Sequence, residues 1–177
     1  MPFLRFLFFA TLSIILALQL RGFDETLRTD ATPAGIVGYE FAWSDAGAEH
    51  YLSAWRNTEA MEAAKVSLGV DFAFLLAYPL MFFTGMALLR RPAAGSSSAT
   101  SAFDRAGAAL QRAVLLCIPL DATENVLLWR MLDHGASNWQ AHLATLCAGI
   151  KFLLVIAAAG WCLVALARRF GMRQSTS

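Results

Sequence analysis

Apolar residues run through this chain in four long stretches separated by more polar segments. The stretches cover residues 3–21, 66–89, 110–132 and 141–167. About 20 predominantly apolar residues are needed for a helix to cross the hydrocarbon core of a bilayer. The pattern therefore predicts an all-α fold, a bundle of four transmembrane helices that makes residues 1–177 a single membrane domain.

The first stretch also resembles a secretory signal peptide, because Arg5 precedes the apolar run. A cleavable signal ends in small residues in an A-x-A arrangement. Here the run ends in ALQLRG, which puts Leu20 and Arg21 where small residues would be needed. We therefore expect residues 3–21 to be retained as a membrane anchor.

The loop at residues 22–65 is too long for a turn and has a helical pattern of its own. Its apolar positions recur at i, i+3, i+4 and i+7, namely Ala48, Tyr51, Leu52 and Trp55. Ser44 or Asp45 is a suitable N-cap for this helix. Tryptophan and tyrosine favour the headgroup zone, so we expect an amphipathic helix on the outer surface between spans one and two.

A second helix is predicted to begin at Asn57 or Thr58, because Glu59 and Glu62 in its first turn complement the helix dipole. It is expected to continue unbroken into the second span. The serine-, alanine- and glycine-rich residues 90–104 then read as a flexible cytoplasmic linker between two helical hairpins.

Composition supports a membrane location. The 177 residues are 58% hydrophobic and 15% charged, with a mean hydropathy of +0.53, whereas soluble domains carry about 25% charged residues. A net charge of +1 provides no basic field, so no nucleic-acid partner is expected.

The distribution of charge predicts the orientation. Arginines gather near both termini and in residues 90–112, while the first loop is acidic. By the positive-inside rule both termini and the linker are cytoplasmic, and the first and third loops are outside. Arginine outnumbers lysine twelve to two, which is typical of GC-rich bacterial genomes, so we expect a multi-pass protein of the bacterial inner membrane.

Polar residues occur inside the predicted spans, most densely in CIPLDATENVLLWRM at residues 117–131. At the helical rise of about 1.5 Å per residue, the ionisable groups of spans two, three and four fall in the same outer half of the bilayer. Charged groups within a membrane face the protein interior. The candidate ligand-binding residues are Asp71, Tyr78, Asp121, Glu124, Asn125 and Lys151.

The charges in this set do not balance. Three carboxylates face Lys151, with Arg130 at the rim as a second cation. The surplus must be neutralised by a proton, an inorganic cation or a ligand amine, and buried carboxylates respond by raising their pKa. The alternative is a closed polar network that only fixes helix packing.

Other chemistry has little support in the sequence. His50, His134 and His142, with Asp133, lie on the outer side without close ligand spacing, so no metal site is expected. Cys117, Cys147 and Cys162 fall at different depths and should stay unpaired. No nucleotide, hydrolase or protease motif is present, and no cofactor is expected.

Two resemblances can be drawn. The segments GIVGYEFAW and AEHYLSAW, with Asp71 and the DATEN run, resemble uncharacterised bacterial four-helix integral membrane proteins over residues 35–130. In architecture alone the chain is similar to the sterol-isomerase and sigma-2-receptor-like superfamily, which implies an acid-lined intramembrane pocket for amines or sterols. Neither resemblance assigns a role to a residue.

Three functions remain open from the sequence. The favoured one is an acid-lined cavity that binds or moves a proton, a cation or an amphipathic ligand. The second is a non-enzymatic accessory or assembly subunit that contacts a membrane-protein partner through its outer loop at Trp43, Tyr51 or Trp55. The third is an intramembrane enzyme for a lipid or isoprenoid, with Asp121 or Glu124 as general acid or base; an enzymatic role is the less favoured.

Overall fold

A computed structural model describes residues 1–90 and 102–174, with side chains up to residue 169. Most of the predicted linker, residues 91–101, lies outside the described residues. The described part is helical and contains no strand: α1 (Pro2–Leu27), α2 (Gly35–Glu40), α3 (Asp45–Trp55), α4 (Glu59–Leu89), α5 (Ala102–Ala113), the 3₁₀ turn η1 (Val114–Leu116), α6 (Cys117–His134) and α7 (Asn138–Gln174).

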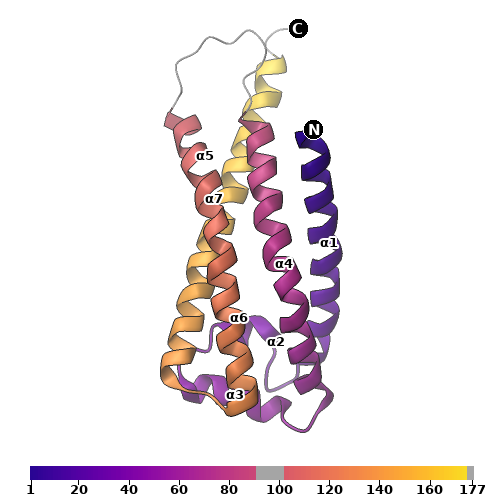
Figure 1. Ribbon diagram of the computed structural model, residues 1–177, viewed down its shortest axis with the longest axis vertical. Coiled ribbons are helices and arrows are strands. Elements are labelled where there is room, and N and C mark those ends of the chain that lie inside the picture. The colour runs from indigo at the N-terminus through magenta and orange to yellow at the C-terminus, as the bar shows by residue number, and fades with distance from the viewer. Residues whose placement is uncertain (91–101, 175–177) are drawn as a thin grey trace.

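The long helices run side by side, as Figure 1 shows. α1 packs along α4, and α6 packs along α7. α5, η1 and α6 follow one another along a single line (Figure 1). The two short helices, α2 and α3, lie together at one end of the molecule, which we call the α2–α3 end; the amino terminus lies at the opposite end.

Among the described residues, α1, α4 and the Asn138–Arg169 part of α7 are the three helices long and apolar enough to cross a membrane. α6 is not one of them, because its 18 residues include four charged side chains: Asp121, Glu124, Arg130 and Asp133. The apolar pattern of the sequence predicts a fourth span here, at residues 110–132. The part of the chain described is therefore all-helical with three helices of membrane-spanning character.

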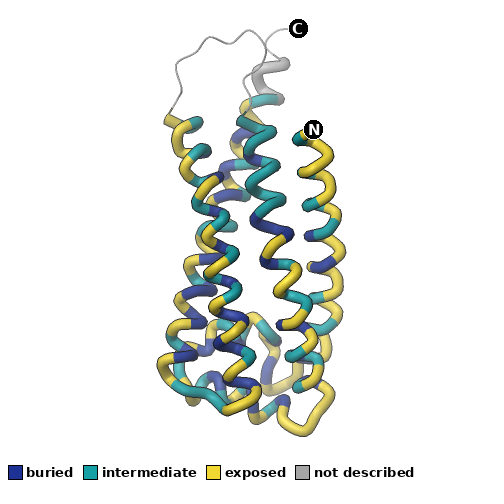
Figure 2. The backbone as a smooth tube through the Cα atoms, viewed as in Figure 1, coloured by how far each residue is buried: buried dark blue, intermediate teal, exposed yellow. Residues whose placement is uncertain are grey.

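The long helices are apolar outside and partly polar inside. Figure 2 shows exposed positions along the length of α1 and α7. The large apolar side chains exposed there include Phe3, Leu4, Leu7, Phe8, Ile14, Ile15, Leu18, Leu143, Leu146, Ile150, Leu153 and Ile156. The buried polar side chains instead include Asp121, Glu124 and Lys151. Lipid solvates apolar side chains and not charges, so this arrangement suits a membrane and not water.

Local sequence explains where two helices begin. The Ser44 hydroxyl accepts a hydrogen bond from the Gly47 amide at 3.0 Å and caps α3. The Thr58 hydroxyl accepts one from the Ala60 amide at 3.3 Å and caps α4. The cap predicted at Ser44 or Asp45 is therefore Ser44, and the helix predicted to begin at Asn57 or Thr58 is capped by Thr58 and continues unbroken to Leu89.

The face predicted for α3 is largely turned into the protein. Ala48, Leu52 and Trp55 are buried, while Tyr51 is half-buried. The Trp55 indole donates a hydrogen bond to the Leu27 carbonyl, 3.0 Å away, at the end of α1. α3 is thereby joined to α1 through a side chain that has no contact with solvent.

Gly107 lets α5 approach α7 closely. A methyl group added there would collide with the indole of Trp161, which already stacks on Phe103 with ring centroids 5.0 Å apart. We expect Gly107→Ala to lower the free energy of unfolding by about 1–3 kcal/mol, the usual cost of overpacking. Thermal unfolding in detergent measures this.

The matched control is Gly149→Ala in α7, where no described atom lies within 4 Å of the added methyl group. Alanine favours helix over glycine, so the melting temperature should be unchanged or raised. Equal destabilisation by both substitutions would contradict the packing described for Gly107.

Candidate functional site

Lys151 of α7 lies at the centre of a buried group of charges. Its Nζ is 2.8 Å from Asp121 Oδ1 and 2.9 Å from Glu124 Oε2, both on α6. Residues 121 and 124 are one helical turn apart, so their side chains emerge on the same face toward α7. Glu124 is 0% exposed and Asp121 1%. The ammonium group therefore holds α6 to α7 through two carboxylates that have almost no contact with solvent.

Two neutral side chains extend this group toward α4. The Tyr78 hydroxyl donates a hydrogen bond to Asp121 Oδ2 at 3.0 Å. The Asn125 amide donates one to Asp71 Oδ2 at 2.6 Å. Each carboxylate thus has a donor from a neighbouring helix, and α4, α6 and α7 all contribute to one polar network.

Glu40 enters the same network from α2. Its Oε2 is 4.0 Å from Lys151 Nζ, and its carboxyl lies within hydrogen-bond distance of Glu124. The backbone of α2 is fixed on both sides: the Tyr39 hydroxyl donates to the Leu128 carbonyl at 3.1 Å, and the Thr145 hydroxyl donates to the Glu40 carbonyl at 2.9 Å. α6 and α7 therefore hold Glu40 over the lysine.

Gly35 and Asp24 determine how the chain enters α2. Gly35 has a φ of +55°, and an added Cβ there would collide with the Asp24 carboxylate. That carboxylate accepts a hydrogen bond from the Ile36 amide at 2.8 Å. The turn places α2 across the end of the long helices, so that its last residue reaches the interior.

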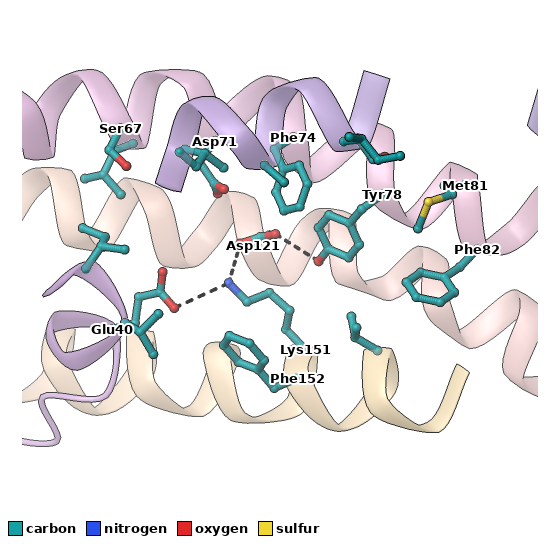
Figure 3. A pocket seen from close by; sticks show the side chains of 18 residues that line it. Glu40, Ser67, Asp71, Phe74, Tyr78, Met81, Phe82, Asp121, Lys151 and Phe152 are labelled. Carbon is teal, nitrogen blue, oxygen red and sulfur yellow. Dashed lines mark hydrogen bonds and ion pairs between the residues drawn. The ribbon is translucent and has the colours of Figure 1, made fainter. Parts of the chain in front are cut away.

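A cavity of about 470 Å³ lies beside this network. Ligand pockets usually measure about 300–1,000 Å³. Figure 3 shows Glu40, Asp71, Asp121 and Lys151 toward one part of the cavity and Met81 and Phe82 toward the other. Its walls come from α1, α2, α4, α6 and α7. The cavity is therefore amphipathic along its length, with a charged end and an apolar end.

Part of the cavity wall is formed by residues that are also exposed at the surface. Ile14 of α1, Val37 of α2 and Phe152 of α7 line the cavity and are 60%, 42% and 37% exposed. These side chains border an opening between α1 and α7. Because the surrounding surfaces of both helices are apolar, the opening faces the region that lipid would occupy.

The structure places the six predicted residues in two neighbouring groups. Tyr78, Asp121, Glu124 and Lys151 are linked by hydrogen bonds and ion pairs, and Asn125 is paired with Asp71. Four of them, Asp71, Tyr78, Asp121 and Lys151, line the cavity. The other two lie behind it: Glu124 contacts Lys151 and Asn125 contacts Asp71. Arg130, expected at the rim as a second cation, is exposed and lies beside a separate shallow groove with Trp129.

Sequence reasoning missed Glu40, which was counted with the other acids of the first loop. One signal marks it: in GIVGYEFAW this acid is surrounded by apolar residues, unlike the other acids of that loop. A carboxylate within an apolar run at a helix terminus is a candidate for burial.

Burial raises the pKa of the Glu40 carboxyl from 4.5 to about 7. The ammonium of Lys151 opposes the shift, while Asp71 and Asp121 add to it. A carboxyl whose pKa is raised on folding binds more protons in the native state than in the unfolded state. Its contribution to stability is therefore lost as pH rises from 4.5 toward 7.

We expect the melting temperature of the protein to fall by roughly 5 °C as pH rises through this window. Glu40→Gln should flatten the profile, because a carboxamide does not titrate. Thermal unfolding of both proteins across the pH series measures the difference between their melting temperatures. The three histidines are present in both proteins, so their contribution is absent from this difference. A parallel decline in both proteins would contradict burial of a titrating Glu40.

The three histidines lie apart from this network, whereas the thiol of Cys117 lies beside it and contacts the Lys151 carbonyl at 3.9 Å. His50 contacts the Ala31 carbonyl, His134 the Arg130 carbonyl and His142 the Trp43 ring. Within the described residues, no three His, Cys, Asp or Glu side chains are arranged to hold a metal ion. Cys117, Cys147 and Cys162 are free thiols.

The fold and the cavity define a class of molecule: an all-helical protein with helices of membrane-spanning character and a charged cavity between them. Comparisons with protein-family models, curated proteins and solved structures found no match for the chain. The likeness to the sterol-isomerase and sigma-2-receptor-like superfamily therefore has no support. The chemistry of the cavity must be read from the residues of this chain.

Proposed function

We propose that this protein binds an amphipathic ligand with a cationic or hydrogen-bond-donating head in the cavity between α1 and α7. The observation that carries the proposal is the cavity itself, about 470 Å³ in volume, with charged side chains at one end and apolar ones at the other. The head lies near Glu40 and Asp71, and the apolar tail extends toward Met81 and Phe82. Along α4, Phe82 is three turns from Asp71, about 16 Å at the helical rise.

The charges favour a cation over an anion. Among the described residues that line the cavity, the acids are Glu40, Asp71 and Asp121, and the base is Lys151. Lys151 already contacts Asp121 and Glu124 at 2.8 and 2.9 Å. Asp71 accepts a hydrogen bond from the neutral Asn125 amide and forms no ion pair within the described part of the chain. A positive head there would reduce the uncompensated negative charge.

In the proposed arrangement the chain crosses the bacterial inner membrane four times, and α5, η1 and α6 together form the third crossing. Both termini are cytoplasmic, and the α2–α3 end faces outward, with α3 as an amphipathic helix at that surface. Two features support this topology. α6 packs against α7, and its two most central charged residues, Asp121 and Glu124, are buried inside the bundle, while Arg130 and Asp133 near its end are exposed. Burial of the central charges lowers the cost of a charged crossing helix.

A series of probes with one tail and different heads tests the function. Dodecyltrimethylammonium, dodecanol and dodecanoate are added at equal mole fractions to nanodiscs that contain the protein, and thermal unfolding is followed. The ammonium probe should raise the melting temperature saturably, as expected for a ligand of the native state. Dodecanoate should have no saturable effect.

Asp71→Asn should weaken binding of the ammonium probe at least about tenfold, the effect of losing one favourable charge contact of about 1.4 kcal/mol. Glu62→Gln is the matched control, because Glu62 is exposed on the same helix and does not line the cavity. Equal responses to all three probes, unaltered in Asp71→Asn, would show simple partition into the bilayer and overturn the proposal.

A further inference from the structure

Two carboxyls meet above Lys151 at the α2–α3 end of the cavity. Glu124 is fully buried, and Glu40 is 14% exposed at its side chain. The two lie within hydrogen-bond distance of each other, and both approach the same ammonium, at 4.0 Å for Glu40 and 2.9 Å for Glu124. A hydrogen bond between two carboxyl groups requires a proton, since two carboxylates offer only acceptors.

The groups around Glu40 leave it in need of that proton. α4 presents Asp71, α6 presents Asp121 and Glu124, and α7 presents Lys151. Ser13 of α1 lines the cavity but does not titrate. Lys151 is closest to Asp121 and Glu124, so the one ammonium is already shared by two carboxylates before Glu40 is counted. Like charges held this close cannot all ionise.

On the proposed function, a cationic head would enter the cavity on the side of Glu40 that Lys151 does not occupy. Glu40 lines the cavity, whereas Glu124 lies behind it. We infer that the Glu40–Glu124 pair holds one shared proton in the empty protein and releases it when a cation binds, so that the site exchanges one proton for one cationic ligand.

The exchange balances in charge and atoms. The O–H bond of one carboxyl breaks, its proton passes to water, and the carboxylate that remains is neutralised by the incoming cation. No other bond changes. The raised pKa of Glu40, about 7, is consistent with release near neutral pH.

Proton release in weakly buffered nanodiscs tests the inference, with dodecyltrimethylammonium as the probe because its charge does not titrate. A pH indicator reports protons, and the bound probe is quantified by the saturation of the thermal shift. We expect about one proton released per bound cation near neutral pH. The ratio is taken per bound cation, so it does not depend on affinity.

Glu40→Gln and Glu124→Gln each remove one carboxyl of the pair and should reduce the ratio to less than half of its original value. A melting transition shows whether each variant is folded, and either variant suffices if the other is not. Saturable binding without proton release in the unmodified protein would overturn the exchange and leave the proposed function intact. Absence of saturable binding would instead overturn the proposed function.

Discussion

Lys151→Met is expected to lower the free energy of unfolding by about 3–5 kcal/mol, which is a large fraction of the stability of an ordinary domain. The substitution removes the ammonium that lies 2.8 and 2.9 Å from Asp121 and Glu124. Both carboxylates would remain buried without a cation. Thermal or denaturant-induced unfolding in detergent measures the loss.

Lys65→Met provides a matched control. Lys65 Nζ lies 2.9 Å from Asp133 Oδ1, the same separation as in the buried pair, but both side chains are about a third exposed. Surface ion pairs contribute little, so this variant should unfold close to the original temperature. A small effect of Lys151→Met, comparable to that of Lys65→Met, would mean that the buried carboxylates do not depend on the lysine.

A charge-matched variant separates the loss of the lysine from the loss of its charge. Combining Lys151→Met with Asp121→Asn and Glu124→Gln leaves no charge at these three positions. Replacing a whole buried ionic group is often tolerated, whereas removing one member of it is not. We expect the triple variant to be more stable than Lys151→Met alone. If the triple variant is as unstable as Lys151→Met alone, the loss of stability comes from the packing of the lysine side chain and not from its charge.

Ala17→Trp should abolish binding of dodecyltrimethylammonium, with a loss of more than about tenfold in affinity, while the protein stays folded. Ala17 of α1 lines the cavity and is exposed, so it is not part of the packed core. An indole at this position therefore extends into the cavity without displacing core side chains. A filled cavity leaves no volume for the dodecyl chain. Saturable thermal shifts in nanodiscs measure the affinity.

Leu18→Trp is the control, because Leu18 is the next residue, is 63% exposed and does not line the cavity. Its indole would face lipid, where tryptophan is tolerated. Binding to this variant should match that of the original protein. Equal binding to Ala17→Trp and Leu18→Trp would place the probe outside the cavity.

Local features of the structure could be predicted from the sequence because they depend on neighbours along the chain. Ser44 and Thr58 cap the helices they precede, and apolar spacing gives the buried face of α3. The meeting of Asp71, Asp121 and Lys151 was predictable for a related reason. Helical rise fixes depth, and charges within apolar helices turn away from lipid.

Glu40 could not be placed in this way. Its position depends on the turn at Gly35 and on contacts of α2 with two helices that lie about a hundred residues further along the chain. Spacing in the sequence carries no information on such contacts. The same limit applies to Arg130, whose exposure follows from how α6 rotates to direct Asp121 and Glu124 inward.

The role expected for Trp55 illustrates the same limit. The sequence groups it with Trp43 and Tyr51 as a surface for a partner protein, since tryptophan in a loop favours an interface. In the structure Trp55 is fully buried and donates to the Leu27 carbonyl, whereas Trp43 is 54% exposed. A substitution at Trp55 would therefore test folding, and Trp43 is the residue at which partner contact should be tested.

Photolabelling locates the ligand most directly. A dodecyltrimethylammonium analogue with a diazirine at the end of its chain is added to the protein in nanodiscs, and the sample is irradiated. The labelled residues are then identified by mass spectrometry. The proposed cavity predicts saturable labelling at its apolar end, at Met81 and Phe82, suppressed by excess unlabelled probe. Labelling confined to lipid-facing residues such as Leu153 and Ile156, and unaffected by unlabelled probe, would contradict it.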